Sequence, residues 1–578
     1  MKKFGIEQKS LNSYIINNMK QNRFKTLEYP NGPVLPPEYE PKGYSVNNTK
    51  LTALSEEMLF SAARYFEHDE YWPKLINTGN FWNCLKRELP ANLKNLSFPA
   101  DFNSVLKQMK SDQEVIKETK KSLTKEQKLA IKAEKDVLKA KHGFVILDGK
   151  NADIGGFMIE APSLIITRGK DPRFGNWKYR VEEKDITINS QVTPKGWKGK
   201  TVFDPSAIWV ISYQIKCGVE KTSSFKKLNK KVCFAGTTDV WQQTRDAKFD
   251  KSKDILKNWK KIQGAINAGI NKGDDEAIII YLIQQTGIRI GNERDEKLQA
   301  LTYGMQTLEN RHIDLTNNGQ ITFDFLGKDS VRDYRTINID PIVFNELKKR
   351  WNQNKPNNKI FKTCDVNGYL KKIHPGATVK NLRTVVCNEI LVNNLKQKKV
   401  SKDSTEAEKL RAIFEANLEI AKTLNHQKNV GKNQKEGEEK IAERVKKAKA
   451  RVKTLKVKHE EKIAKLNDKL NKYRIAYKGM KILKEKENEI AEAKIKLTTQ
   501  MERAKTAIEK TEFALDKKKL TKDISLGTSL AAYADPKLLY SYLKSIELPI
   551  EKIYTQSLRK AFVWAENIDS EYWRTYPS

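Results

Sequence analysis

The chain has few of the residues that build disulfide frameworks or metal centres. Its 578 residues include 5 cysteines and 6 histidines, and no two cysteines form a Cys-x-x-Cys pair. An odd number of scattered thiols argues against both a disulfide framework and a zinc site. We therefore expect a reducing, intracellular compartment and no bound metal.

Long apolar runs are also missing. The longest, Ala277–Ile283, is far shorter than the roughly 18 residues that a membrane span requires. The basic residues that follow Met1 lead into no apolar core of a signal peptide. The sequence predicts a soluble protein with no membrane partner.

Positive charge, in contrast, is abundant. Lys and Arg number 108 against 72 Asp and Glu, which gives a formal net charge of +36 at pH 7. Such an excess favours a polyanionic partner, and nucleic acid first, because Lys and Arg that neutralise phosphates release the counterions condensed on them. Solvated basic helix faces are the alternative explanation for this charge.

The chain is longer than one core usually supports, so we expect several domains. Composition predicts a polar tail, a mixed helical part, a β-rich part, a mainly helical domain, a Lys/Glu/Ala-rich segment and a short aromatic-rich end. The corresponding ranges are 1–26, 27–118, 119–235, 236–429, 430–522 and 523–578.

Local patterns place several elements. Thr124 and Gln127 predict a capping box that opens a helix through Lys141, with Gly143 as its stop. β-Branched and aromatic residues then predict strands at 144–147, 179–181, 207–215 and 231–234, and a hairpin at 321–339.

The segment 430–522 predicts an antiparallel coiled-coil hairpin, with a break near 471–479. Apolar residues follow 3-4-3 spacing on its first arm and recur every seven residues on its second: Val445, Ala448, Val452 and Leu455, then Leu483, Ile490, Leu497 and Ala504. The two ends of such a hairpin lie close together. It serves either as a spacer or as an arm that binds a partner.

A tyrosine beyond this hairpin, Tyr533, is a candidate nucleophile. A phenol attacks at neutral pH only where cations stabilise the phenolate or the transition state. Four upstream residues could supply such groups: Arg289 after the most apolar helical run, Lys328 at the hairpin tip, Arg383 near the start of a helical run, and His426.

Each of these four residues also has an ordinary structural explanation. Arg289 and Arg383 could pair with Glu293 or Asp295, Lys328 could be a solvated turn lysine, and a lone histidine is more often structural than catalytic.

In the order Arg, Lys, Arg, His, Tyr, this set resembles the active site of the eukaryotic-type type IB DNA topoisomerases, the nuclear topoisomerase I family. The resemblance covers nearly the whole chain from about Tyr29 onward. Its most specific segments are Phe323–Ser330, Gly291–Glu293, Asn425–Gln427, Leu526–Ser529, Asp535–Pro536 and Pro549–Tyr554. Arg168–Gly175 further resembles the DNA-facing loop of the family's cap lobe.

The resemblance implies a multidomain α+β fold: a bilobed DNA clamp with a mixed α/β cap and a mainly helical catalytic domain related to tyrosine recombinases. The coiled-coil hairpin becomes a linker, and the C-terminal domain is small and helical. The cap spans 27–118 and 119–235, the catalytic domain 236–429, and the C-terminal domain 523–578.

The activity implied is ATP-independent relaxation of positive and negative supercoils through a 3′-phosphotyrosyl intermediate. Tyr533 would be the nucleophile, Lys328 the general acid, and Arg289, Arg383 and His426 the donors to the nonbridging phosphate oxygens. The family motifs further imply DNA contacts by Arg168, Asn292, Asp329, Lys380 and Gln427.

No ATP and no metal are expected as cofactors. Pro194–Thr201 ends like a nucleotide phosphate loop, yet Pro194 stands where that loop requires its first glycine. The expected partner is double-stranded DNA, bound by a monomer in the nucleus or, if the chain is virus-encoded, at a viral replication site. Replication or transcription machinery is a candidate protein partner, and Gln8–Ile15 resembles a sliding-clamp peptide.

Two alternatives remain open from the sequence. A tyrosine recombinase or integrase uses a similar set of residues, and a noncatalytic basic DNA-binding protein would explain the charge alone.

Departures from the family are few. Leu530 and Ala532 stand where relatives commonly have Lys and Asn, and the family's long charged N-terminal tail is reduced to about 25 residues.

Overall fold

The computed structural model describes residues 22–220, 226–292, 300–428 and 434–577. The contacts within it form two compact units. The first comprises Met1–Lys248 and Gly291–Thr363, and the second Phe249–Ile290 and Cys364–Ser578. The predicted domain 236–429 thus contributes to both units. Helices and several sheets occur together, as the α+β class predicts.

The helices of the first unit begin with a cluster around an aromatic core. This core includes Phe81, Phe102 and Trp177, all with no exposed surface. The helices are α2 (Ala53–Ala63), α3 (Tyr71–Asn77), α4 (Asn80–Glu88), α5 (Asn103–Ser122) and α6 (Lys125–His142).

Helix α6 confirms the capping prediction. The hydroxyl of Thr124 accepts from the Gln127 N–H, the Gln127 side chain accepts from the Thr124 N–H, and Gly143 caps the C-terminus.

Among the described residues, the strands of the first unit form three sheets and a two-stranded ribbon. The ribbon consists of β2 (Ser45–Val46) and β3 (Thr49–Lys50). One sheet has the order β1 (Leu27–Glu28), β4 (Phe144–Leu147), β5 (Lys150–Asp153). A larger sheet has the order β6 (Ser163–Leu164), β7 (Trp177–Lys178), β10 (Trp209–Cys217), β8 (Ile186–Asn189), β9 (Lys200–Val202), with β11 (Lys226–Cys233) on β10.

Comparison with the predicted strands gives one correction. The strand at 144–147 is confirmed, and those at 207–215 and 231–234 are present with shifted bounds. The strand at 179–181 is wrong, because this part of the chain pairs as β7, Trp177–Lys178. The same edge of β10 pairs with β8 from Ile211 to Tyr213, and β7 pairs with β10 only through Lys178 and Cys217 among the described residues.

The packed structure begins inside the predicted polar tail. Phe24 is 3% exposed, the backbone N–H groups of Lys25 and Thr26 donate to the Asp148 carboxylate, and Arg23 donates to the Thr244 hydroxyl. The candidate sliding-clamp peptide Gln8–Ile15 lies outside the described residues.

The predicted hairpin is present as β13 (Gln320–Leu326) and β14 (Arg332–Asn338), with β12 (Ile313–Asp314) on its edge. Seven residue pairs align from Gln320 with Asn338 to Leu326 with Arg332. The turn between them holds Lys328, as predicted, and its next two residues have positive φ values, 61° at Asp329 and 55° at Ser330. Helix α10 (Pro341–Gln353) follows.

The second unit is helical. Helix α7 (Asp239–Lys257) crosses from the first unit into it. Within it, α12 packs against α9 and α13, and α13 packs against α16. Its shorter helices are α8 (Trp259–Lys272), α9 (Asp275–Thr286), α11 (Val366–Ile373), α12 (Val379–Gln397), α13 (Glu406–Thr423), α16 (Leu526–Ala532), α17 (Pro536–Ser545) and α18 (Gln556–Ala561).

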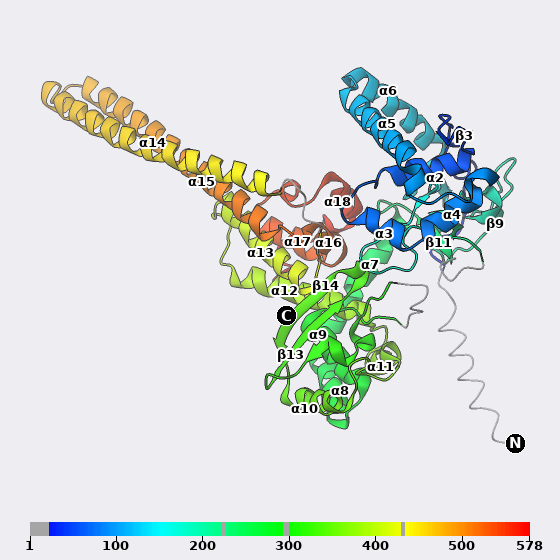
Figure 1. The fold of residues 1–578 in the computed structure, drawn as a ribbon. Helices are drawn as coiled ribbons and strands as arrows, with labels where there is room; N and C mark the ends of the chain where they lie inside the picture. Colours follow the sequence, from blue (N-terminus) through cyan, green and yellow to red (C-terminus); the bar gives the residue numbers. More distant parts are fainter. Residues whose placement is uncertain (1–21, 221–225, 293–299, 429–433, 578) are drawn as a thin grey trace. The chain divides into compact units, whose positions relative to one another are not determined.

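Two long helices, α14 (Gln434–Ala476) and α15 (Ile482–Leu520), lie side by side in this unit (Figure 1). They run antiparallel, because ion pairs join Lys449 to Glu512 and Arg474 to Glu487. Most of the predicted apolar stripe is half-buried, and Val445 and Ile490 are buried. The turn falls at 477–481 and so overlaps only the end of the predicted break.

None of the described helices is long and apolar enough to cross a membrane.

Candidate active site

Tyr533 lies at the C-terminal end of α16, in the second unit. Its N–H donates to the carbonyl of Ser529 at 2.9 Å, and its side chain is half-buried. The next residues, Ala534 and Asp535, are buried, and Asp535 caps the following helix α17. The tyrosine is therefore held in a tight connection between two helices.

Arg383 contacts the tyrosine hydroxyl directly. Its side chain, 4% exposed, donates from Nη1 to Tyr533 Oη at 2.8 Å and from Nε to the Gly287 carbonyl at 2.7 Å. The guanidinium carbon lies 5.1 Å from the centroid of the tyrosine ring. Burial lowers the pKa of Arg383, and Arg289 lowers it further, while Tyr533 opposes the change. The guanidinium is thus a desolvated cation aimed at the phenolic oxygen.

His426 lies beside the ring of Tyr533. Its ring centroid lies 5.5 Å from that of Tyr533, and neither ring nitrogen has a hydrogen-bond partner among the described residues. Burial, followed by the charges of Arg383 and Arg289, lowers the pKa of His426 to about 4. The imidazole is therefore neutral at pH 7 and can donate one hydrogen bond to an incoming anion.

Arg289 is the second cation of this cluster. It follows Gly287, whose φ of 65° ends helix α9, and its charge contributes to the pKa shifts of both Arg383 and His426. Arg289 is exposed. Its predicted alternative partners, Glu293 and Asp295, lie outside the described residues.

Backbone pairing explains how His426 and Tyr533 meet although the long helices α14 and α15 separate them in sequence. The Ser525 N–H donates to the His426 carbonyl, and the Lys428 N–H donates to the Asp523 carbonyl, both at 2.7 Å. This pairing joins the segment before α14 to the segment after α15, as the sequence predicted.

Lys328 and Asp329 lie on the exposed hairpin turn of the first unit. Arg168 is half-buried in a loop of the same unit. A Cβ added to the neighbouring Gly169 would lie 2.4 Å from Ser330 Oγ, so this loop and the hairpin turn touch.

Three further residues predicted to contact DNA are exposed. Asn292 is in the first unit, Lys380 is in the first turn of α12, and Gln427 donates from Nε2 to Asn425 Oδ1 at 2.8 Å. The structure thus brings Arg289, Arg383, His426 and Tyr533 together within one unit.

Sequence reasoning missed Asn388, which is completely buried on α12. Its Nδ2 donates to the Tyr533 carbonyl at 3.1 Å and to the Thr384 carbonyl at 2.8 Å, and its Oδ1 accepts from the Asp535 N–H at 2.7 Å. The available signal was an amide directly after the apolar run Val385–Cys387, because a buried polar group requires hydrogen-bond partners.

No described group of three or more His, Cys, Asp or Glu residues is arranged to hold a metal ion. The Pro194–Thr201 segment leads into strand β9, whereas a nucleotide phosphate loop opens a helix.

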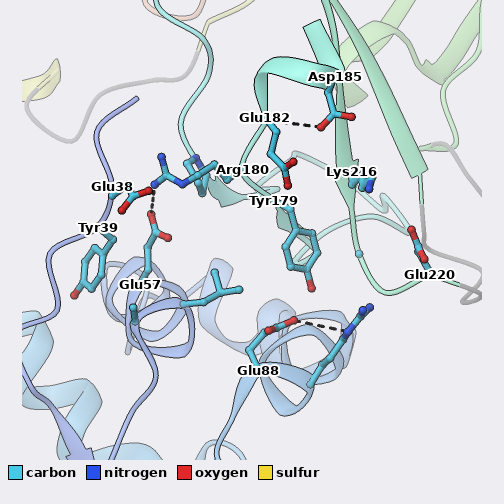
Figure 2. A pocket seen from close by; sticks show the side chains of 15 residues that line it. Glu38, Tyr39, Glu57, Glu88, Tyr179, Arg180, Glu182, Asp185, Lys216 and Glu220 are labelled. Atoms are coloured by element: carbon cyan, nitrogen blue, oxygen red, sulfur yellow. Dashed lines mark hydrogen bonds and ion pairs between the residues drawn. The ribbon is translucent and has the colours of Figure 1, made fainter. Parts of the chain in front are cut away.

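The first unit contains a cavity of about 650 Å³ (Figure 2). None of the ten predicted site residues, all of them described, lines it. Three basic and six acidic residues line this cavity. The acidic residues are Glu38, Glu57, Glu88, Glu182, Asp185 and Glu220.

Three family models match the chain. They are the DNA binding fragment of eukaryotic DNA topoisomerase I at residues 22–223, its catalytic core at 237–460, and the C-terminal topoisomerase domain at 505–574. The three models together cover most of the chain and describe parts of one family. The chain belongs to the eukaryotic DNA topoisomerase I family.

Named relatives agree over most of the chain. DNA topoisomerase 1 of Xenopus laevis is 30% identical over 93% of this chain and 64% of its own length. DNA topoisomerase 1 beta of Arabidopsis thaliana is 29% identical over 96% of this chain and 59% of its own, and the Homo sapiens DNA topoisomerase 1 is 29% identical over 95% and 71%. The chain thus spans about three fifths of the plant and frog relatives.

Proposed function

We propose that this protein is a type IB DNA topoisomerase, which relaxes positive and negative supercoils without ATP. The observation that carries the proposal is the 2.8 Å hydrogen bond from Arg383 Nη1 to Tyr533 Oη, inside a cluster that also holds Arg289 and His426. A buried cation that donates to a phenolic oxygen stabilises the phenolate, which is the attacking form.

The proposed reaction begins with attack of Tyr533 Oη on a phosphorus of duplex DNA. The new bond joins Oη to phosphorus, and the bond from phosphorus to the 5′ oxygen breaks, leaving a 3′-phosphotyrosyl end and a 5′-hydroxyl. Arg289, Arg383 and His426 donate to the nonbridging oxygens, where negative charge concentrates in the transition state. The free 5′ end swivels, and its hydroxyl then reverses the reaction, so no external energy source is needed.

Lys328 is the proposed general acid for the departing 5′ oxygen. An exposed ammonium on a hairpin turn can enter a DNA groove and reach a backbone oxygen.

A substrate with sulfur in place of the bridging 5′ oxygen tests this role, because a thiolate leaves without a proton. Lys328→Ala should slow cleavage of normal DNA by roughly 100-fold or more and leave cleavage of the sulfur substrate close to wild type. Equal slowing on both substrates would assign Lys328 to binding instead.

DNA contacts by Arg168, Asn292, Asp329, Lys380 and Gln427 belong to the same proposal, since four of them are exposed and all five can bond phosphate or base edges. The proposed clamp has a cap at 27–235, a catalytic domain related to tyrosine recombinases at 236–429, and a C-terminal domain at 523–578. Helices α14 and α15 form its coiled-coil linker. The proposed location is the nucleus, or a viral replication site if the chain is virus-encoded.

Mapping the covalent adduct tests the nucleophile. Protein trapped on a nicked substrate, denatured and digested, should yield a peptide with a nucleotide on Tyr533, and Tyr533→Phe should form no adduct. Tyr542→Phe is the matched control, because the Tyr542 hydroxyl is buried without a hydrogen-bond partner among the described residues. A nucleotide on any other residue would overturn the assignment.

Relaxation of a plasmid without special sites separates this function from its rivals. A tyrosine recombinase would act only at defined sites, and a noncatalytic DNA-binding protein would form no adduct. Failure of the wild-type protein to relax such a plasmid would reject the proposal.

A further inference from the structure

Asn388 hydrogen-bonds the backbone at Tyr533 and at the second residue after it. One side-chain amide donates to the carbonyl of Tyr533 and accepts from the N–H of Asp535, at 3.1 and 2.7 Å. The bonded groups belong to residues two apart, the pattern by which a neighbouring strand would pair with an extended segment. The side chain therefore takes the place of a backbone partner where no strand is present.

The geometry uses both N–H donors of the carboxamide and one acceptor site of its oxygen. The second hydrogen of Nδ2 donates to the Thr384 carbonyl, one helical turn earlier, at 2.8 Å. This third bond fixes the orientation of the amide, so that the donor faces the Tyr533 carbonyl and the acceptor faces the Asp535 N–H. Because Asn388 has no exposed surface, water cannot replace any lost bond.

The same helix holds the other end of the tyrosine. Arg383, five residues before Asn388 on α12, bonds the hydroxyl, while Asn388 bonds the main chain. One rigid helix thus sets the position of the phenolic oxygen relative to the guanidinium that donates to it.

We propose that Asn388 is a positioning residue for the nucleophile, which acts by holding the Tyr533 backbone in register with Arg383. This inference rests on the proposed function and goes beyond it by naming a residue that touches neither DNA nor the reacting atoms. Loss of the Asn388 hydrogen bonds should slow the cleavage step and leave DNA binding unchanged, because misplacement of an attacking group by about 1 Å can cost about 100-fold in rate.

The sharpest variant is Asn388→Asp, because its two protonation states differ in what they can bond. A neutral carboxylic acid has one O–H donor and one carbonyl acceptor, enough for both Tyr533 and Asp535. The carboxylate has no donor and repels the Tyr533 carbonyl. Burial raises the pKa of an acid at such a site, so the neutral form is reached at mildly acidic pH.

Single-turnover cleavage of a nicked substrate, as a ratio to wild type at each pH, measures the effect. The ratio for Asn388→Asp should be roughly 0.01 to 0.1 at pH 8 and rise several-fold toward pH 5.5. Asn388→Ala should be slowed by a similar factor at every pH, with a Kd for DNA within about twofold of wild type. A flat ratio for Asn388→Asp, or a weakened Kd that accounts for the slowing, would overturn the proposal.

Asn394 is the matched control. It lies on the same helix and makes the same bond to the carbonyl four residues earlier, Ile390, at 3.0 Å, but its other partner is Glu419. Asn394→Asp and Asn394→Ala should therefore cleave at the wild-type rate with no change in pH profile.

A readout independent of catalysis separates this inference from the proposed function. With 3-fluorotyrosine at position 533, the wild type and Asn394→Ala should each give one sharp fluorine resonance, and Asn388→Ala should give a shifted or broadened one. An unchanged resonance would reject the positioning role even if the protein is catalytically inactive. Absence of cleavage by the wild type, with the resonance shifted in Asn388→Ala, would reject the topoisomerase reaction alone.

Discussion

The tyrosine site and the long helix pair use the same residue types in opposite environments. At the site, Arg383 is 4% exposed and bonded to a carbonyl and a hydroxyl at fixed distances. On the helix pair, Lys449 and Glu512 form their ion pair with 59% and 38% of their side chains exposed. The chemistry of each cation is therefore set by its burial and by the number of fixed partners, far more than by the net charge of the chain.

The two regions also differ in the interactions that fix their structure. The site is fixed by buried polar groups that require partners, and the side chains of Arg383 and Asn388 find theirs within it. The helix pair is fixed by a narrow apolar stripe and by ion pairs that water can replace. We expect single substitutions to have large effects in the first region and small effects in the second.

The strongest test of this contrast is Arg383→Ala. Removal of a preorganised donor to developing charge costs about 100- to 1,000-fold in rate, and here the phenolic oxygen loses its donor as well. We expect at least this loss in single-turnover DNA cleavage. Arg474→Ala is the control, because Arg474 of α14 pairs with Glu487 of α15 at 2.8 Å with 58% of its side chain exposed. If the two substitutions slow cleavage equally, the contrast between the regions is wrong.

An intermediate effect is expected from the titration of His426. Its pKa of about 4 in the folded protein is below the ordinary value of about 6.5 in the unfolded chain. As pH falls from 6.5 to 4, the unfolded chain gains a proton that the folded site excludes, so the free energy of unfolding decreases.

His426→Gln removes this group. Between pH 7 and pH 4.5 the wild type should lose on the order of 1–2 kcal/mol more stability than the variant, measured by denaturant unfolding. Parallel stability profiles would show that the imidazole is protonated in the fold and would remove the desolvated character that we assign to the site.

The smallest effect belongs to the helix pair. Lys449→Ala and Glu512→Ala, alone or together, should change the free energy of unfolding by less than about 1 kcal/mol, because exposed ion pairs contribute little. Plasmid relaxation at physiological salt should be unchanged. A coupling energy well above this value in the double-mutant cycle would show that the helix pair is held together by its charges.

The sequence located the catalytic candidates because each stands in a short, specific motif. Four of the five, Arg289, Arg383, His426 and Tyr533, meet in one unit, and the helix pair and the hairpin around Lys328 are also present. Local signals sufficed for these elements, since turn residues, apolar periodicity and capping boxes act over a few residues.

The features that the sequence did not reveal depend on contacts distant in the chain. Asn388 bonds to residues about 145 positions later, and Phe24 is buried by a sheet whose other strands come more than a hundred residues later. The short strand β7 shares one edge of β10 with β8, which the residues at 179–181 cannot encode. Such long-range pairings override local propensity.

The backbone pairing between 426–428 and 523–525 has a consequence for variation within the family. Since these two short segments already meet, the helices between them can lengthen, shorten or change their surface residues without displacing Tyr533. Natural selection can therefore change the flexibility and the surface contacts of α14 and α15, while the tyrosine site stays constant.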